Sequence, residues 1–314
     1  MRPLPRLPLA AIAVIAAAAA LAPASAVAAP DCVNRPAARV VYSGQGLLES
    51  VIVGRAGRLY FSSTPSGRPG RIMKADNPRA QPRMLAEDIS GPGGMVFHNR
   101  KLIAGYGDTI ANGLQGDEDP RAGLFAINPK TGSRTVFASG LGMANGVARA
   151  PNGTIFASND FGMKLDRVAG GIVTHGWAEV ESSNGLAVDR AGRFLYVAQT
   201  FVEVPAIQRV EIADPTNVTT FASAPEEGGA ALDGMTRDRG GNLYVTANFA
   251  GEVWRVDRRG RICVLARGLQ SPSAVAFGRG ERRFRGGNLY VVTFNGDVVE
   301  LKGANQAGFP GRAG

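Results

Sequence analysis

The sequence is poor in residues that bind transition metals. It has 2 cysteines and 2 histidines among 314 residues, which argues against zinc and copper centres because these use sulfur and imidazole ligands. Aromatic residues make up 7% and charged residues 19%, whereas glycine occurs 42 times. This composition favours many short strands joined by tight turns over long charged helices.

Only one long apolar run occurs, and it lies at the start of the chain. Residues 7–21 follow two arginines, and the small residues Ala26 and Ala28 match an A-x-A cleavage site. The run is shorter than the roughly 20 residues that a membrane helix needs. We therefore expect residues 1–28 to be a secretory signal peptide, with an uncleaved anchor as the alternative. The mature chain is then periplasmic or extracellular, with no stable membrane insertion.

The chain is basic, with a formal net charge of +9. A positive charge can indicate a nucleic acid or an acidic surface as partner. Here, however, the arginines are scattered singly through turns, and no basic run carries interleaved aromatic residues. We therefore expect a solvated basic surface and no nucleic-acid partner.

A repeated unit runs through the chain. Each unit begins with a short apolar strand, and successive starts lie about 40 to 50 residues apart, the length of a four-stranded propeller blade. A Gly-rich turn and a second strand follow, as in Leu195-Tyr-Val, and two further strands complete the unit. The residues that lead the six units are Glu49, Gly93, Asn145, Asn184, Asp233 and Ser273.

The last unit lacks its fourth strand, because it breaks off at Leu301. The missing strand occurs at the other end of the chain, where the segment starting at Arg39 resembles the fourth strand that starts at Arg134. Pairing the two ends closes the ring and removes exposed strand edges. The sequence thus predicts an all-β fold, a single six-bladed β-propeller over residues 29–314, with a disordered tail at 303–314. No helix of useful length is expected outside the signal peptide.

The two cysteines fall on neighbouring blades of this arrangement. Cys32 precedes the closing strand of blade six, and Cys263 lies in the outer strand of blade five. An even pair in an oxidising compartment is a disulfide candidate, and the blade geometry makes a bridge possible. Two unpaired buried thiols are the alternative.

The leading residues of the six inner strands should converge on the central channel. Four of them carry side-chain oxygens: Glu49, Asn145, Asn184 and Asp233. Two carboxylates and two amide carbonyls suit Ca²⁺, and two negative charges match its charge. Other divalent ions such as Mg²⁺, Mn²⁺ or Zn²⁺ are the further choices. The alternative is that Asn and Asp merely open turns before strands.

Polar residues also end the second strands, close to the same mouth of the channel. Such groups above a metal would form a substrate pocket, although strand-to-loop junctions are often polar as well. The predicted substrate-binding residues are Asp108, Asn159, Gln199, Asn248 and the leading residue Ser273.

The four oxygen-bearing residues stand in local motifs and in a chain order that resemble the regucalcin/gluconolactonase family of six-bladed propellers. The motifs are Asn145-Gly-Val, Asn184-Gly-Leu-Ala-Val-Asp and Asp233-Gly-Met-Thr, preceded by Glu49. The resemblance extends from Val40 to Leu301, and the layout is also similar to that of diisopropyl fluorophosphatase and the paraoxonases. In that group such residues hold a catalytic divalent ion, usually Ca²⁺.

The resemblance implies a secreted, metal-dependent lactonase or esterase that acts on a small lactone or ester. Asp233 or Glu49 would be the general base, or Asp233 a nucleophile in a phosphotriesterase-like variant. His98 and His175 are expected away from the site. One alternative is a non-catalytic exported propeller that binds a glycan, peptide or protein. Another is an enzyme resembling strictosidine synthase, which has no catalytic metal.

Overall fold

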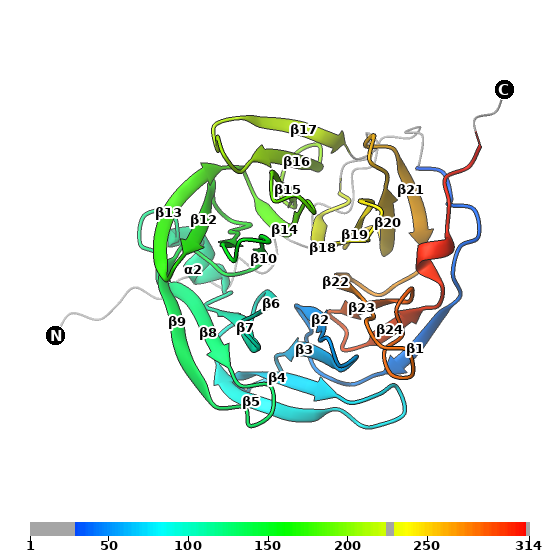
Figure 1. Cartoon of the computed structure of the whole chain (residues 1–314), viewed down its shortest axis with the longest axis horizontal. Helices are drawn as coiled ribbons and strands as arrows, with labels where there is room; N and C mark the ends of the chain where they lie inside the picture. Colours follow the sequence, from blue (N-terminus) through cyan, green and yellow to red (C-terminus); the bar gives the residue numbers. More distant parts are fainter. Residues whose placement is uncertain (1–28, 224–228, 312–314) are drawn as a thin grey trace.

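The protein folds as a ring of six sheets around a central hollow (Figure 1). Its structure is a computed structural model that describes residues 29–223 and 229–311, so the expected signal peptide lies outside the described residues. Each sheet has four antiparallel strands that follow one another outward from the axis. The predicted six-bladed β-propeller is confirmed.

The blades follow one another in chain order, and the last blade uses both ends of the chain. Blade one contains β2 (Val51–Val53), β3 (Leu59–Ser63), β4 (Gly70–Ala75) and β5 (Arg83–Ile89). Blade two contains β6 (Met95–His98), β7 (Lys101–Tyr106), β8 (Ala122–Ile127) and β9 (Arg134–Leu141). Blade three contains β10 (Val147–Arg149), β11 (Ile155–Ala157), β12 (Lys164–Ala169) and β13 (Ile172–Glu179). Blade four contains β14 (Ser183–Val188), β15 (Phe194–Gln199), β16 (Ala206–Glu211) and β17 (Val218–Ser223). Blade five contains β18 (Leu232–Arg237), β19 (Leu243–Ala247), β20 (Glu252–Val256) and β21 (Ile262–Ala266). Blade six contains β22 (Pro272–Phe277), β23 (Leu289–Thr293), β24 (Val298–Leu301) and β1 (Ala38–Tyr42).

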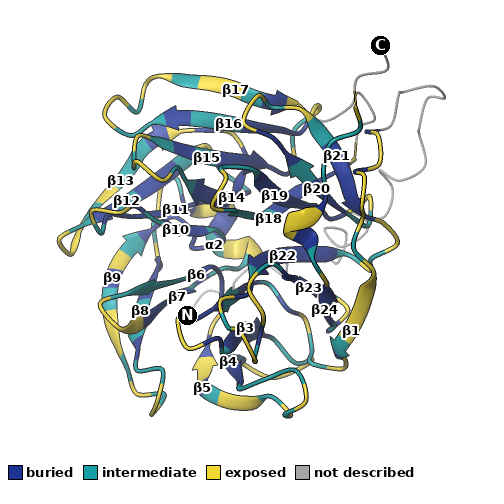
Figure 2. Cartoon of the chain, turned by 45° about the vertical axis from the view of Figure 1, so that its right-hand side comes forward, coloured by how far each residue is buried: buried dark blue, intermediate teal, exposed yellow. Residues whose placement is uncertain are grey.

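Burial falls from the axis toward the rim of the ring (Figure 2). Second strands such as β19 and β23 are buried at every position, whereas the outer strand β17 is mostly exposed or half-buried. The cause is that both faces of each blade pack on neighbouring blades, so a second strand has no solvent side. Continuous apolar runs such as Leu243-Tyr-Val fit this double burial.

The N-terminal strand closes the ring as the repeat predicts. β1 pairs antiparallel with β24, with Ala38 opposite Leu301 and Arg39 opposite Glu300. The Arg39 guanidinium also contacts the Glu300 carboxylate at 2.6 Å. Strands from the two ends of the chain thus share one blade. Closure of the ring therefore requires both ends of the chain to be folded.

The tail prediction is wrong for the residues that the structure describes. A 3₁₀ turn, η3 (Ala304–Gln306), follows β24, and Ala304 and Ala307 are buried against the cluster that contains Cys32. Val33 and Gly308 exchange backbone hydrogen bonds of 2.9 and 3.0 Å. The tail is ordered because the N-terminal segment, far away in sequence, packs on it.

A short helix was also not expected. α2 (Ile110–Gln115) lies between β7 and β8, and the Thr109 side chain caps it by accepting from the Asn112 backbone N–H. It starts two residues after a predicted site residue, Asp108, and therefore stands beside the channel mouth. Among the described residues no helix is long and apolar enough to span a membrane.

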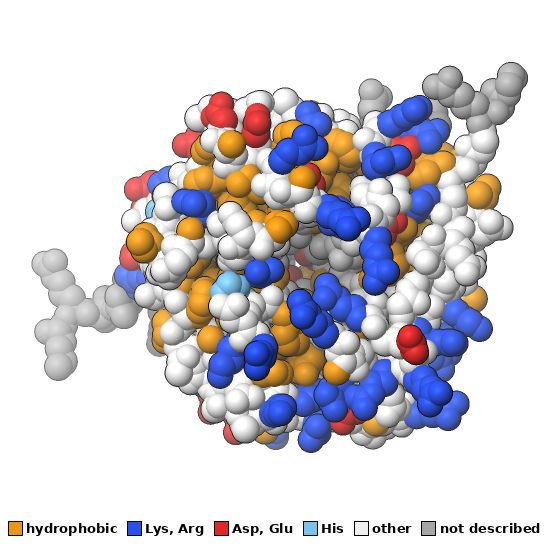
Figure 3. All heavy atoms as spheres, in the orientation of Figure 1, with side chains coloured by type: hydrophobic (Ala, Val, Ile, Leu, Met, Phe, Trp, Pro, Cys, Tyr) orange, Lys and Arg blue, Asp and Glu red, His pale blue; other side chains and the backbone are white. Residues whose placement is uncertain are grey.

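The two faces of the ring carry different parts of each blade. Inner strands begin on the face that holds α2 and end on the opposite face, where hairpins lead back into the second strands. Figure 3 looks along the axis onto the face with these hairpins, and the central hollow is open at its middle. The leading residues of the inner strands therefore lie at the far mouth.

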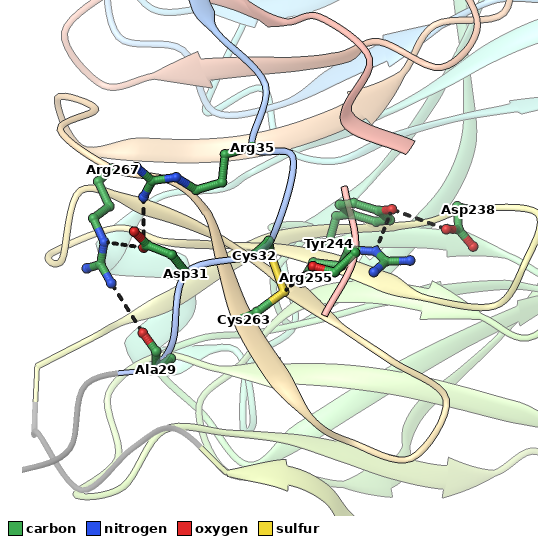
Figure 4. The surroundings of a disulfide bond; sticks show 10 residues. Ala29, Asp31, Cys32, Arg35, Asp238, Tyr244, Arg255, Cys263 and Arg267 are labelled. Carbon is green, nitrogen blue, oxygen red and sulfur yellow. Dashed lines mark hydrogen bonds and ion pairs between the residues drawn. A yellow bond between two sulfur atoms is a disulfide. The ribbon is translucent and has the colours of Figure 1, made fainter. Parts of the chain in front are cut away.

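The N-terminal segment is bonded to the outer strand of blade five (Figure 4). A disulfide joins Cys32 to Cys263, with Cα atoms 5.0 Å apart. The Cys32 backbone N–H donates to the Val264 carbonyl at 2.9 Å, and Arg267 contacts Asp31 at 3.0 Å. These contacts tie the segment before β1 to the blade next to the one that β1 completes.

Candidate functional site

A small cavity lies in the central channel, and all four predicted metal ligands line it. Glu49, Asn145, Asn184 and Asp233 come from four different blades, and the cavity has a volume of about 60 Å³. A water molecule occupies roughly 30 Å³ of liquid, so this space suits an ion with one or two waters. It is too small for a sugar-sized molecule.

Two of the four residues lie within strands, whereas Glu49 and Asn145 lie just before β2 and β10. Asn184 is the second residue of β14 and Asp233 the second residue of β18. Asn145, Asn184 and Asp233 are buried, with 8%, 3% and 4% of their surface exposed, and Glu49 is half-buried. Burial of polar side chains inside strands is costly unless they bind something, which favours the ligand interpretation over the turn interpretation.

The glycines that follow Asn145 and Asn184 are needed for close approach of the inner strands. A Cβ atom on Gly146 would lie 2.1 Å from the Asn184 carbonyl oxygen, and one on Gly185 would lie 2.2 Å from the Asp233 carbonyl oxygen. Neither position tolerates a side chain without moving a neighbouring blade. The Asn-Gly motifs therefore bring successive ligands together rather than form turns.

Buried hydroxyl groups fix the ligands from the adjacent blade. Ser158 Oγ donates to the Asn184 carbonyl at 2.7 Å, and Thr200 Oγ1 donates to the carbonyl that precedes Asp233 at 2.6 Å. Ser273 Oγ donates to the carbonyl that precedes Glu49, also at 2.6 Å. Ser273 is fully buried, so the structure places this predicted substrate-binding residue in a positioning role.

The cavity is surrounded by carboxyl groups whose negative charge no basic residue balances. Burial raises the pKa of Glu49 well above its usual range, and the negative charges of Asp233 and Asp108 add to this. The pKa of Asp233 is likewise raised, first by burial and then by Asp160 and Asp108. No lysine, arginine or histidine lines the cavity among the described residues. Such a site favours a cation.

Asp108 belongs to the same group of carboxyls. Burial raises its pKa to about 7, and a hydrogen bond with the Asn145 side chain partly offsets the rise. The structure therefore brings this predicted substrate-binding residue next to a predicted ligand.

Asp160 is a site residue that the sequence interpretation missed. Its side chain is buried, with 7% of its surface exposed, and Oδ1 has no hydrogen-bond partner within the described residues. Burial, followed by the charge of Asp108, raises its pKa to about 8. A buried carboxyl oxygen without a partner is costly, so this atom is available to a ligand. Nothing in the dipeptide Asn159-Asp160 distinguishes the two residues in advance.

The other predicted substrate-binding residues mainly hold the structure together. Asn159 Nδ2 donates to the Gly113 carbonyl at 2.9 Å and so fastens α2 to blade three. Gln199 Nε2 donates to the Glu181 carbonyl at 2.9 Å. Asn248 contacts the site, because its Nδ2 lies 3.3 Å from Asp233 Oδ2.

A larger groove adjoins the site between blades three and four. It has a volume of about 490 Å³, within the usual range for small-molecule sites. It is lined by Asp117, Asp160, Phe161, Gly162, Met163, Glu181, Ser182 and Phe201. The rings of Phe161 and Phe201 lie 5.3 Å apart, centroid to centroid. The groove thus joins an apolar wall to the unpartnered carboxyl of Asp160.

Both histidines lie away from the cavity. His98 ends β6 at the hairpin face, where Arg149 Nε donates to its Nδ1 at 3.0 Å. His175 lies on the outer strand β13, with Nδ1 at 2.7 Å from the Asp166 carboxylate. Across residues 29–223 and 229–311, no three His, Cys, Asp or Glu side chains are placed to hold a metal together. An ion in this cavity would therefore need ligands besides carboxylates, and the side-chain oxygens of Asn145 and Asn184 line the same space.

The fold and the site define a class, namely six-bladed propellers with an oxygen-lined central channel. Comparison with known proteins narrows it, because residues 163–295 match a family described as SMP-30/Gluconolactonase/LRE-like region. The resemblance to the regucalcin/gluconolactonase family is confirmed by this match. A search of curated proteins finds no match.

Solved structures share the fold over most of the chain. A calcium-binding protein, regucalcin, from Agrobacterium tumefaciens strain C58 has 18% identity and a TM-score of 0.65, covering 85% of this chain and 93% of its own. A gluconolactonase from Xanthomonas campestris has 16% identity and a TM-score of 0.66, covering 90% and 99%. An auxiliary nutrient binding protein from Bacteroides thetaiotaomicron has 9% identity and a TM-score of 0.62, covering 82% and 68%. At such identities the similarity shows the fold alone.

Proposed function

We propose that this protein is an exported, divalent-metal-dependent hydrolase that opens a lactone or an ester. One observation carries the proposal: four oxygen-bearing side chains from four blades line one small cavity, with no basic residue to balance their charge. The family match to a gluconolactonase-like region supports a lactonase-type reaction. The calcium binding and gluconolactonase activity named for two structural neighbours agree with it.

The donor set fits a hard cation, with Ca²⁺ preferred and Mg²⁺, Mn²⁺ or Zn²⁺ as other divalent choices. Glu49, Asn145, Asn184 and Asp233 would hold the ion through two carboxylates and two amide carbonyls. When bound, the ion supplies Lewis-acid polarisation of the substrate's carbonyl or phosphoryl oxygen. Burial and the neighbouring carboxylates raise the pKa of Glu49 and Asp233, which supports a site that takes up a positive charge.

The residues of the chain itself move protons and orient groups. Asp233 or Glu49 would act as the general base and take a proton from the attacking water. Asn248 holds the Asp233 carboxyl through its Nδ2. In a phosphotriesterase-like reaction Asp233 would instead attack phosphorus directly.

The groove between blades three and four would hold the part of the substrate that does not react. Phe161, Met163 and Phe201 offer apolar surface, whereas Asp160 and Glu181 are acidic. The groove is lined by no basic side chain within the described residues, so it disfavours anionic substituents. The proposed substrate is therefore a neutral lactone or ester with an apolar substituent.

A metal and activity assay tests this function. The exported protein, produced from the full-length sequence, is analysed for bound metal by mass spectrometry. It is then assayed on lactones, aryl esters and a phosphotriester, with and without chelator. Chelator-sensitive hydrolysis with one bound divalent ion supports the proposal. Bound metal without hydrolysis favours a non-catalytic propeller that binds a glycan, peptide or protein.

Export and the disulfide belong to the same proposal. Residues 1–28 would direct secretion and be removed, and the Cys32–Cys263 bridge would form outside the reducing cytoplasm. The mass of the secreted protein tests both points, since cleavage removes the leader and the bridge leaves no thiol to alkylate. Full-length protein with two reactive thiols would contradict them.

A further inference from the structure

The hairpins between inner and second strands bring arginines together on the face opposite the carboxyl cluster. Each of the six hairpins, or the strand end that leads into it, supplies an arginine that makes no ion pair within the described residues. These are Arg55, Arg100, Arg149, Arg190, Arg239 and Arg279, here called the arginine ring. Side chains that are scattered singly in the sequence thus share one face.

Five members of the arginine ring are exposed, and Arg149 is half-buried against His98. Lys and Arg side chains surround the central hollow in Figure 3, with few acidic side chains among them. Few carboxylates lie in these hairpins: Asp189 pairs with Arg193, whereas Asp238, which accepts from Asn242 and Tyr244, and the exposed Glu281 keep their negative charge against the six arginines. The positive charge of this face is therefore largely unbalanced.

The hairpins of blades six and one touch, which concentrates the charge. A Cβ atom on Gly57 would lie 2.8 Å from Gly280 Cα, and the Phe284 backbone N–H donates to the Gly57 carbonyl at 3.2 Å. Arg283, in the same insertion, has a buried Nη1 with no hydrogen-bond partner among the described residues. Desolvation of its guanidinium by neighbouring atoms, followed by the positive charges of Arg55 and Arg239, lowers the pKa of Arg279.

We propose that the arginine ring binds an anionic polysaccharide that carries carboxylate or phosphate groups. Guanidinium groups pair with such anions through two parallel hydrogen bonds. Charges spread around a circle suit a flexible polymer with repeated anions better than a single small ion. This site is separate from the proposed active site, which lies at the opposite mouth of the channel. Binding through the arginine ring would hold the protein on an acidic matrix and leave the mouth with the proposed active site open.

Two other polyanions fit the face less well. A membrane-binding surface inserts large apolar side chains, and a single-stranded nucleic acid stacks its bases on exposed aromatic rings. None of the large hydrophobic residues that are exposed within the described part of the chain lies in the six hairpins. The six hairpins thus offer charge without large exposed apolar or aromatic side chains, as expected for binding a carbohydrate polymer.

Binding of polygalacturonate, with neutral dextran as control, tests the proposal. The exported protein is titrated by calorimetry at low and at high salt, and the triple variant Arg55→Gln, Arg239→Gln, Arg279→Gln is compared with it. We expect salt-sensitive binding of polygalacturonate only, weakened about tenfold or more in the variant, because each exposed ion pair contributes a few-fold. Lactone hydrolysis should be unchanged.

A matched variant separates the site from net charge alone. Arg35→Gln, Arg68→Gln, Arg121→Gln removes the same charge from exposed positions outside the hairpins, and should keep the affinity of the unmodified protein. Equal weakening in both triple variants would overturn the proposal. So would equally tight binding of vesicles rich in anionic lipid or of a single-stranded oligonucleotide, or no binding of polygalacturonate at low salt.

Discussion

At the scale of single residues, the buried carboxyl groups of the protein differ in how many hydrogen bonds they accept. Asp166 is buried but accepts hydrogen bonds from the Gly142 and Gly176 backbone and contacts His175. Asp160 is equally buried, yet its Oδ1 has no partner among the described residues. The Asp166 carboxyl therefore stabilises the fold. The Asp160 carboxyl lowers the stability of the fold, and its Oδ1 is available to bind a ligand.

Asp160→Asn should therefore raise the stability of the chelated protein at pH 7 by about 1 kcal/mol or more, since folding no longer has to bury and protonate a carboxyl group that is ionised in the unfolded chain. It should also weaken divalent-ion binding, because one negative charge is lost beside the cavity. Urea unfolding with chelator and calorimetry with Ca²⁺ measure the two effects. Asp166→Asn is the control and should destabilise the protein; a destabilised Asp160→Asn protein would contradict this account.

The same carboxyls predict how stability depends on pH. In the folded, metal-free protein the pKa of Asp108 is raised to about 7 and that of Asp160 to about 8, whereas unfolded Asp titrates near 4. Between these values the folded state binds more protons than the unfolded state, so stability falls as pH rises.

The expected result is a melting temperature that drops from pH 5 to pH 8 in the presence of chelator. Added Ca²⁺ should abolish most of the drop, because the ion replaces the protons that neutralise the cluster. A melting temperature in chelator that rises over this interval would show that the carboxyls are not clustered as described.

At the scale of elements, the groove depends on how blade three meets blade four. Phe201 follows the end of β15, and Phe249 follows the corresponding end of β19 in blade five. The two rings are similarly exposed, 46% and 56%, but only Phe201 lines the groove. They form a matched pair for testing what the groove does.

Phe201→Ala should lower kcat/KM for lactones with an alkyl substituent by about tenfold, because a buried apolar contact of a few methylene groups is lost. The unsubstituted lactone should be little affected. Phe249→Ala should leave both substrates unchanged. Steady-state kinetics on a series of alkyl chain lengths measures this, and a loss independent of chain length would mean that the groove does not bind the substituent.

Some elements could be predicted from sequence, and others could not. The blades and the closing strand could be predicted because apolar strands alternate with Gly-rich turns in each repeat. Both signals are contained in short stretches of the sequence. α2 and the ordering of residues 303–311 depend on contacts with residues far away in the chain, such as Val33 with Gly308. Asp160 lacks a local signal for the same reason, since its burial depends on neighbouring blades and on α2.

At the scale of the whole molecule, the ring holds its two chain ends in place by different means. β1 completes blade six, and the Cys32–Cys263 disulfide fastens the preceding segment to blade five. The order of the blades and the convergence of Glu49, Asn145, Asn184 and Asp233 on one cavity could be predicted because one register repeats. The hairpin arginines are isolated from one another in the sequence. That they share one face becomes evident only when the repeats are placed around a ring.

Replacing both cysteines by serine should lower the free energy of unfolding by up to about 5 kcal/mol, because the bridge closes a sequence separation of 231 residues. Urea unfolding of the variant and of the unmodified protein, with and without reductant, measures the loss. The unmodified protein should approach the variant when reduced. Equal stability of the two under oxidising conditions would mean that the bridge does not form.

The most direct test of the central claim is Ca²⁺ titration by calorimetry on the unmodified protein and on Asp233→Asn. Asp233 is buried in the channel and shares the cavity with the other three proposed ligands. The asparagine keeps the shape but removes one of the two ligand charges. The account predicts one ion per chain in the unmodified protein and an affinity at least about a hundredfold weaker in the variant, with the fold retained. Equal Ca²⁺ binding by both proteins, or none by the folded unmodified protein, would contradict it.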